Sequence, residues 1–235
     1  MNEEHGPLVD PKRIPSWLRP LVERTAEVDT KELGWPHTPC GEDVRPAAVL
    51  ILLGEGSERT GPDVLLLRRA DGLNSHPGQV AFPGGAVDRG DEGPVDAALR
   101  ESIEEVGVLP SGITPVATLP ELHLAHSAFR VTPVLGHWHE PAPVQPVDPD
   151  ETAAVARVPI ATLADPANRF KVRLAGRTSP AFLVPGMLVW GFTGGLLSGL
   201  LDLAGWSREW NRGDVRELDE AWRAAVEAAD PGCER

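Results

Sequence analysis

The sequence has only two cysteines, Cys40 and Cys233, among its 235 residues. Two cysteines exclude a framework of several disulfides and a zinc ribbon with four cysteine ligands. Positive charge is also scarce, because 22 Lys and Arg stand against 35 Asp and Glu and leave a net charge of −13. Such an acidic chain has no general attraction for nucleic acid or anionic lipid. We therefore expect no nucleic-acid partner, and an anionic substrate would need a bound metal ion or a few well-placed arginines.

We expect neither a targeting segment nor a membrane-spanning segment. Residues 1–5 have neither the basic nor the apolar region of a signal peptide. Residues 178–201 carry no charge, but their prolines and glycines would interrupt a spanning helix. We expect a buried strand over 181–190 and a packed helix over 192–204 instead. Together with the few cysteines, these features predict a cytoplasmic protein without a membrane partner.

Hydrophobic residues are plentiful, at 41% of the chain, which is enough to form a core. Apolar runs alternate with Gly- and Pro-rich turns and with helical patterns, and this order predicts a mixed α/β domain. We expect strands over 47–53, 64–69, 113–119, 128–138 and 170–174, and helices over 15–27, 94–106 and 161–166. The domain is expected to span 44–206, between an N-terminal extension over 1–43 and an acidic helical tail over 207–235. In the tail, one helical face is expected to hold Val215, Leu218, Trp222 and Val226.

The expected helix over 94–106 carries the residues with the clearest chemistry. Pro94 suits its first position and Gly107 its end. At about 100° per residue, one face of this helix gathers three glutamates, Glu101, Glu104 and Glu105. The opposite face is expected to pack inward, and it holds Val95, Leu99, Ser102, Ile103 and Val106.

The three glutamates have no basic partner in the next helical turn, because no Lys or Arg follows any of them by four residues. Carboxylates about 5–6 Å apart repel each other by roughly 3 kcal/mol per pair at an effective dielectric constant near 20. A divalent cation would remove that cost, and oxygen ligands without His or Cys favour Mg²⁺ or Mn²⁺. The alternative interpretation is an acidic face that is simply solvated.

The turn before this helix and the helix itself resemble a known motif. Gly85 and the run Arg100-Glu101-Ser102-Ile103-Glu104-Glu105-Val106-Gly107-Val108 resemble the Nudix box, G-x5-E-x7-R-E-U-x-E-E-x-G-U, in which U is bulky and apolar. Ser102 stands where an apolar residue is expected, and the loop is one residue longer than in the standard box. Counting forward from Gly85 reaches Asp91 at the position of the first Glu, whereas counting back from Arg100 reaches Glu92.

The segment before the box resembles the second motif of the coenzyme A pyrophosphatases, a group within the Nudix superfamily. That motif reads L-L-T-x-R-[SA]-x3-R-x3-G-x3-F-P-G-G, and it aligns with residues 65–85. Leu67 stands where Thr is expected, and Asn74 stands where the second Arg is expected. The whole resemblance extends over about 44–206.

The resemblance implies an α/β/α sandwich with a mixed β-sheet, and a hydrolase that cleaves a nucleoside diphosphate linked to another group. It implies a Mg²⁺ or Mn²⁺ cofactor bound by Glu101, Glu104, Glu105 and the carbonyl of Gly85. Arg100 is expected to orient a carboxylate of the box, with a surface arginine as the alternative. The general base is expected to be Glu104, Glu101 or Glu151. The alternative role for Glu151 is a charge that stabilises the N-terminus of a helix.

The implied substrate is a small nucleotide-derived molecule, coenzyme A or its acyl or oxidised forms, cleaved to 4′-phosphopantetheine and adenosine 3′,5′-bisphosphate. Arg68, Arg69 and Arg130 are candidates for contacting its phosphates, with exposed or salt-bridged side chains as the alternative. Asn74 keeps a different substrate open: ADP-ribose, a dinucleotide or a nucleoside triphosphate. A third hypothesis is a non-catalytic binding module of the same fold, against which the complete set of glutamates argues. We also keep a homodimer open, since dimers are common among soluble enzymes.

Overall fold

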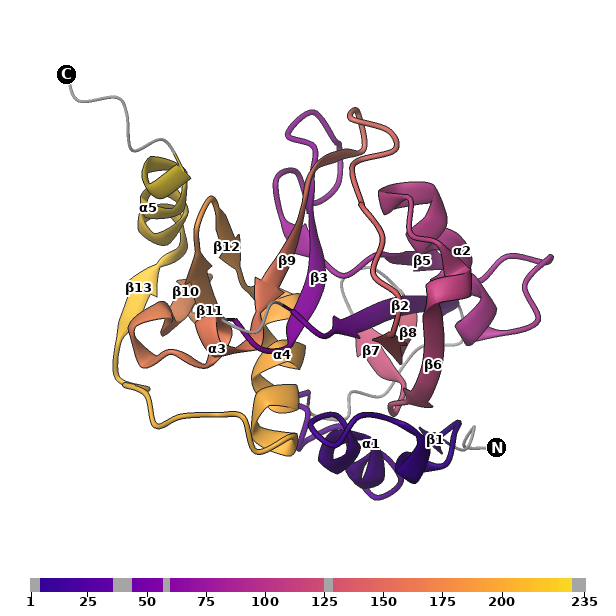
Figure 1. Ribbon diagram of the computed structural model, residues 1–235. Coiled ribbons are helices and arrows are strands. Elements are labelled where there is room, and N and C mark those ends of the chain that lie inside the picture. The colour runs from indigo at the N-terminus through magenta and orange to yellow at the C-terminus, as the bar shows by residue number, and fades with distance from the viewer. Residues whose placement is uncertain (1–4, 36–43, 57–59, 125–128, 230–235) are drawn as a thin grey trace.

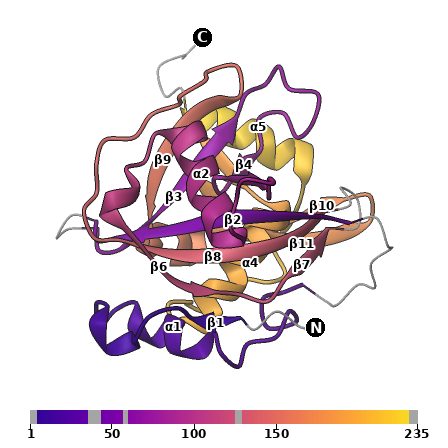
Figure 2. The same cartoon turned by 90° about the vertical axis from the view of Figure 1, so that its right-hand side faces the viewer.

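The protein is built from two β-sheets and the helices that cover them (Figure 1). The computed structural model describes residues 5–35, 44–56, 60–124 and 129–229. Within these residues, nine strands form a mixed main sheet and four strands form a second sheet. The main sheet lies between α2 (Pro94–Val106) on one face and α1 (Arg19–Arg24) with α4 (Gly191–Leu203) on the other. This confirms the expected α/β/α sandwich, and Figure 2 views the sheet with α2 toward the reader.

The main sheet has the strand order β1-β6-β8-β2-β3-β4, with β5 beside β2, β7 beside β8 and β9 beside β3. The bounds of its strands are β1 Gly6–Pro7, β2 Arg45–Gly54, β3 Asp63–Arg69, β4 Val80–Ala81, β5 Gly84–Ala86, β6 Ile113–Thr118, β7 Leu122–Leu124, β8 Phe129–Trp138 and β9 Thr152–Pro159. β2 and β8 run parallel, and β2 and β3 pair antiparallel beside their connecting turn. The strands expected over 47–53, 64–69, 113–119 and 128–138 are confirmed, although residue 128 lies outside the described residues.

Strand β2 shows why the main sheet is apolar on both faces. Ala48, Leu50 and Leu52 pack beneath α2, whereas Ile51 and Leu53 pack toward α1 and α4. Side chains alternate across a strand. A sheet that helices cover on both faces therefore needs apolar residues at successive positions.

The second sheet has the strand order β12-β11-β10-β13. Its strands are β10 Arg169–Leu174, β11 Arg177–Val184, β12 Met187–Val189 and β13 Val215–Glu217. The single strand expected over 181–190 is wrong, because the chain turns at Gly186 (φ +75°) and β11 pairs antiparallel with β12. Glycine adopts this left-handed conformation without a steric penalty, which allows the tight hairpin.

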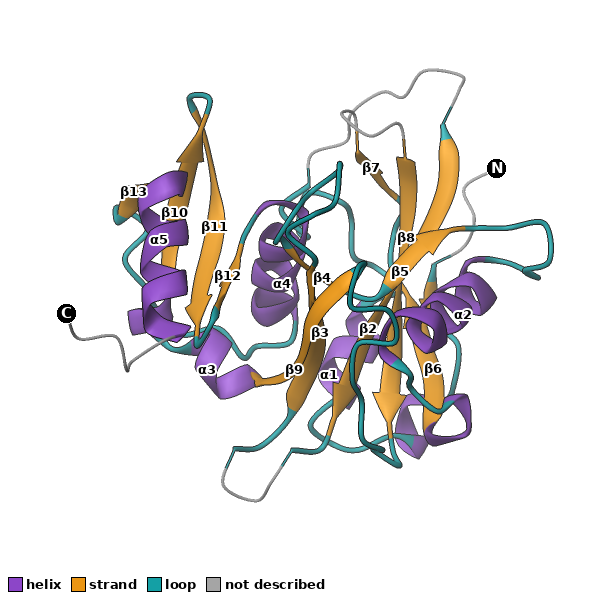
Figure 3. Ribbon diagram, turned by 90° about the horizontal axis from the view of Figure 1, so that it is seen from above, coloured by secondary structure: helices purple, strands orange, loops and turns teal. Residues whose placement is uncertain are grey.

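The C-terminal tail contributes a strand and a helix to this second unit. α5 (Leu218–Ala229) lies across β10 and β11 (Figure 3), and Leu218 and Trp222 pack with the apolar residues beneath it. The apolar face expected for the tail is wrong at both ends. Val215 belongs to β13, which pairs parallel with β10, and Val226 is 56% exposed.

Short helical elements complete the fold: α3 Ile160–Ala164, η1 Pro11–Arg13, η2 Pro110–Gly112 and η3 Pro166–Asn168. α2 has the bounds expected from the sequence, and α4 differs from the expected helix over 192–204 by one residue at each end. The helix expected over 15–27 is shorter, because Pro20 suits only the first turn of a helix and places the start of α1 at Arg19. Residues 178–201 are divided among β11, β12 and α4, and no described helix has the length and apolar character to cross a bilayer.

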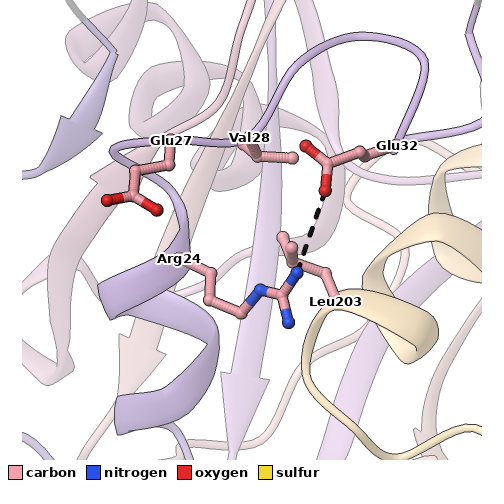
Figure 4. Close-up of a pocket in the computed structure, with 5 residues that line it drawn as sticks. All are labelled: Arg24, Glu27, Val28, Glu32 and Leu203. Atoms are coloured by element: carbon pink, nitrogen blue, oxygen red, sulfur yellow. Dashed lines mark ion pairs between the residues drawn. The ribbon is translucent and has the colours of Figure 1, made fainter.

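A cavity of about 170 Å³ lies between the segment that follows α1 and the end of α4 (Figure 4). Its lining residues are Arg24, Glu27, Val28, Glu32 and Leu203. The Arg24 guanidinium lies 3.8 Å from the Glu32 carboxylate across it. The cavity belongs to the α1 and α4 side of the main sheet, and the glutamates of α2 are not part of its lining.

Candidate active site

The inward face of α2 differs from the face expected from the sequence. Its buried residues are Ala97, Ala98, Ser102 and Val106, whereas Ile103 is 40% exposed. On a helical wheel, Glu101 and Glu105 fall between the buried Ala97 and Ala98, so both point toward the sheet. The alternative of a simply solvated acidic face is therefore wrong for Glu101 and Glu105, which are half-buried, whereas Glu104 is exposed.

Two glycines of β5 contact the inward-facing carboxylates in different ways. β5 pairs with β2, which places Gly85 beside Ala48 on the α2 face of the sheet. A Cβ atom added to Gly85 would collide with the carboxylate of Glu101. The backbone N–H of Gly84 donates a hydrogen bond to Glu105 Oε2 at 2.9 Å. Sequence reasoning missed this backbone donor, for which the Gly84-Gly85 pair was the available signal.

Burial raises the pKa values of both Glu101 and Glu105. Burial raises the pKa of Glu105 to about 7, against the hydrogen bond from Gly84, and the charges of Glu101 and Glu151 raise it further. Burial also raises the pKa of Glu101, against the opposing effect of Arg100. Glu105 therefore holds its proton up to near neutral pH unless a positive charge replaces it.

Arg100 connects the carboxylates of the preceding turn with those of α2. Its Nε and Nη2 atoms each lie 3.0 Å from one oxygen of Asp91, which makes a bidentate pair. Its Nη1 atom lies 2.9 Å from Glu101 and 3.0 Å from Glu104, and Nη2 also donates to the Ala86 carbonyl at 3.0 Å. Arg100 thus bridges Asp91, Glu101 and Glu104, and its role of orienting carboxylates stays a prediction.

The structure also shows which acidic residue of the longer loop meets Arg100. The Asp91 side chain is 4% exposed, and the Arg100 guanidinium lowers its pKa. Glu92 is exposed to solvent and forms no ion pair with the described residues. Asp91, the residue reached by counting forward from Gly85, is therefore the acidic residue that pairs with Arg100. The added residue of the loop follows Asp91.

Two of the three candidate bases, Glu104 and Glu151, differ in their surroundings. Glu104 is exposed, and Arg100 Nη1 holds its carboxylate at 3.0 Å. Glu151 directly precedes β9, and its charge raises the pKa of Glu105, so it lies within electrostatic range of the buried carboxylates. The alternative of a charge at a helix N-terminus is wrong for Glu151, because a strand follows it.

Among the three candidate arginines, Arg69 is the one that faces the buried carboxylates. It is the last residue of β3, just past a shift in the pairing register between β3 and β9 at Arg68 and Arg69. The charge of Arg69 lowers the pKa of Glu105. Its Nε atom is buried and has no hydrogen-bond partner among the described residues. Arg69 therefore offers an unused donor next to Glu105.

The other two arginines pair with carboxylates elsewhere. Arg68 points to the opposite side of β3 and forms an ion pair with Asp71. Arg130 lies on the α2 face of β8, but its Nε atom is 2.9 Å from Glu121 Oε1. The structure thus brings Arg69, and not Arg68 or Arg130, to the carboxylate cluster.

The donor groups fit a hard cation that is shared with a substrate. Among the described residues, no three His, Cys, Asp or Glu side chains are gathered closely enough to enclose a metal ion. Mg²⁺ does not need such a cage, since it commonly takes one or two carboxylates plus substrate phosphates and keeps several waters. Glu105 receives only one hydrogen bond within the described chain, from Gly84. Glu101 and Glu105 beside Gly85 therefore fit Mg²⁺ or Mn²⁺ as a partial oxygen set.

Comparisons with known proteins agree with one another. The sequence model of the NUDIX domain matches residues 43–176. The Nudix hydrolase NudL of Enterobacter sp. strain 638 is 42% identical over 122 residues, which cover 49% of this chain and 58% of NudL. NudL of Escherichia coli K12 is 42% identical over 117 residues, 50% of this chain and 58% of that protein. The matches thus span little more than half the length of these curated relatives.

A solved structure shows the same fold. The crystal structure of RenU, a Nudix hydrolase from M. smegmatis, matches with a TM-score of 0.50 and 23% identity. The match covers 72% of this chain and 90% of RenU. At this identity, the likeness concerns the fold.

Proposed function

Because this chain belongs to the Nudix domain family, we propose that it is a hydrolase that cleaves a diphosphate linkage with Mg²⁺ or Mn²⁺. The observation that carries the proposal is the inward-facing pair Glu101 and Glu105, next to the side-chain-free Gly85. Burying a carboxylate without a compensating charge is costly. A site that keeps this arrangement is suited to binding a cation that in turn attracts an anionic substrate.

The residues of the site have separate roles in holding the metal ion and in orienting the carboxylates. A bound Mg²⁺ or Mn²⁺ supplies polarisation of the phosphate and a more acidic water. Glu101, Glu105 and the Gly85 carbonyl would hold that ion, with Glu104 as a further oxygen ligand. Arg100 fixes the orientation of Glu101 and Glu104 through its hydrogen bonds. This order, in place before substrate binds, is what preorganised electrostatic catalysis requires.

Glu151 is the general base that we favour over Glu104. Glu151 is exposed, forms no ion pair with the described residues and lies within electrostatic range of Glu105. Glu104 is held by Arg100 and is therefore better placed as a metal ligand. A base must reach the proton of the attacking water directly or through one further water.

Coenzyme A or its acyl and oxidised forms are the substrates that we propose, with 4′-phosphopantetheine and adenosine 3′,5′-bisphosphate as products. The support is the coenzyme A pyrophosphatase-like motif over 65–85, whose first Arg position, Arg69, faces the carboxylates. Arg69 would donate to a substrate phosphate through the terminal nitrogens of its guanidinium, since its Nε atom is buried. Asn74, exposed where that motif has its second Arg, favours ADP-ribose or a dinucleotide as the second candidate.

A substrate panel tests the proposal. Purified protein with Mg²⁺ or Mn²⁺ is offered coenzyme A, ADP-ribose, a dinucleotide and a nucleoside triphosphate, and the products are separated by chromatography. We expect adenosine 3′,5′-bisphosphate from coenzyme A, and no product when EDTA is present. Glu105→Gln should lower the rate by orders of magnitude, whereas Glu92→Gln, a matched change at an exposed glutamate, should not.

The outcomes distinguish an error in the proposed substrate from an error in the proposed hydrolase activity. Faster hydrolysis of ADP-ribose than of coenzyme A would overturn the proposed substrate and keep the diphosphate hydrolase. Metal-dependent hydrolysis of no member of the panel would support a binding module instead. Full activity of Glu105→Gln would contradict the proposed metal site.

A further inference from the structure

The helix of the C-terminal tail contacts a loop that belongs to the site. α5 lies outside the segment 43–176 that matches the NUDIX domain, yet its Trp222 packs against Gly78. A Cβ atom added to Gly78 would lie 2.8 Å from Trp222 Cζ2 and 3.3 Å from Trp222 Cη2. The indole ring therefore rests directly on the backbone of the loop.

That loop, residues 70–79, is closed at its base by backbone hydrogen bonds. The N–H of Arg69 donates to the Gln79 carbonyl at 2.9 Å, and the N–H of Gly78 donates to the Ala70 carbonyl at 3.3 Å. The N–H of Ala70 donates to the Glu151 carbonyl at 2.9 Å. The indole of Trp222 therefore contacts Gly78, which is hydrogen-bonded to Ala70. Ala70 is in turn next to Arg69 in the chain and hydrogen-bonded to Glu151.

The conformation of Gly78 makes this path sensitive to packing. Gly78 is buried at φ +66°, a left-handed conformation that glycine adopts readily. A Cβ atom there would also lie 2.8 Å from Asp71 Oδ1, so the residue is enclosed between Asp71 and Trp222. Removal of the indole would open one side of this enclosure and leave only the weak 3.3 Å hydrogen bond to hold Gly78.

We propose that Trp222 is a positioning residue: by packing on Gly78 it fixes the base of the 70–79 loop and keeps Arg69 aligned with the substrate phosphate beside Glu105. This inference rests on the proposed function, because it assigns Arg69 to substrate binding. Trp222 itself touches no reacting group. Small misplacements of a binding group are sufficient to cost a large factor in rate.

Kinetics of Trp222→Ala test the proposal through its dependence on Arg69. We expect Trp222→Ala to lower kcat/KM roughly 10-fold or more, mainly through KM, and Trp222→Phe to restore most of the loss. In an Arg69→Ala background, Trp222→Ala should have little further effect, because coupled residues are not additive. Equal fold-losses in both backgrounds would overturn the proposal.

The matched control is Leu218→Ala on the same helix. Leu218 packs on the second sheet with Trp222, so its truncation weakens the attachment of α5 without removing the indole from Gly78. We expect its KM to stay near the wild-type value. A rise in KM equal to that of Trp222→Ala would show that Trp222 acts only by holding α5 in place, and would overturn the proposal.

Hydrogen exchange of the loop amides tests the same contact without substrate, and so separates this inference from the proposed function. We expect the Gly78 and Ala70 amides to exchange at least tenfold faster in Trp222→Ala and unchanged in Leu218→Ala. Unchanged exchange in Trp222→Ala would overturn the proposal even if the enzyme hydrolyses coenzyme A. Faster exchange in an enzyme that prefers another diphosphate would keep the positioning role and change only the substrate.

Discussion

The replacement Glu105→Gln should stabilise the metal-free protein at high pH. Glutamine has the same shape and can still accept the hydrogen bond from the Gly84 N–H, but it carries no charge to bury. Burial raises the pKa of Glu105 from 4.5 to about 7. At 1.36 kcal/mol per pKa unit, ionising the buried group costs the folded state about 3 kcal/mol.

The sign and the pH window follow from the raised pKa. The folded protein holds the Glu105 proton more tightly than the unfolded chain does, so this contribution to stability is complete below pH 4.5. It is lost as the pH rises through about 7. The difference in unfolding free energy between Glu105→Gln and wild type should therefore grow from pH 4.5 to pH 8 by about 3 kcal/mol.

Urea unfolding in EDTA, followed by far-UV circular dichroism at several pH values, measures this difference. Subtracting wild type from variant removes the contribution of carboxylates that do not interact with Glu105, and exposed Glu92→Gln supplies a baseline that should stay within ±0.5 kcal/mol. Adding Mg²⁺ should stabilise wild type and not Glu105→Gln. A difference that does not change between pH 4.5 and pH 8 would refute the reasoning, since it would mean that Glu105 ionises in the folded protein as readily as in water.

Three further changes test the geometry of the site. Gly85→Ala should lower kcat at least 100-fold, because the new methyl group displaces the Glu101 carboxylate; initial rates measure it. Asp91→Asn should lower kcat/KM roughly tenfold, because Arg100 loses its bidentate partner, and steady-state kinetics measure it. Glu151→Gln should lower kcat by roughly 10²- to 10⁴-fold at nearly constant KM, as expected for a general base.

Controls decide how these results are interpreted. A circular dichroism spectrum like that of wild type must accompany each loss of activity. Normal activity in Gly85→Ala would show that the Glu101 carboxylate has another productive position. A larger loss in Glu104→Gln than in Glu151→Gln would assign the base to Glu104.

Local sequence signals predicted the framework of the site well. Pro94 and Gly107 gave the bounds of α2, and continuous apolar runs located β2 and β3. These features depend on residues that are neighbours along the chain. The hairpin of β11 and β12 was missed, although Pro185 and Gly186 offered a turn signal inside the apolar segment.

The orientation of α2 could not be predicted from its own periodicity. The helix presents Glu101 and Glu105 to β5, more than fifteen residues earlier in the chain, where Gly85 leaves space for Glu101 and the Gly84 N–H binds Glu105. The pairing of β13 with β10 and the packing of Trp222 on Gly78 likewise join segments that are distant in sequence. The distinction between Arg69 and its neighbour Arg68 required knowing which face of β3 each occupies.

Binding of Mn²⁺, followed by electron paramagnetic resonance of the free ion, tests the central claim most directly. The account predicts that wild type and Glu92→Gln withdraw Mn²⁺ from solution with similar affinity and that Glu105→Gln binds it far more weakly. Equal binding by Glu105→Gln and wild type would contradict the claim that the inward-facing carboxylates hold the metal ion.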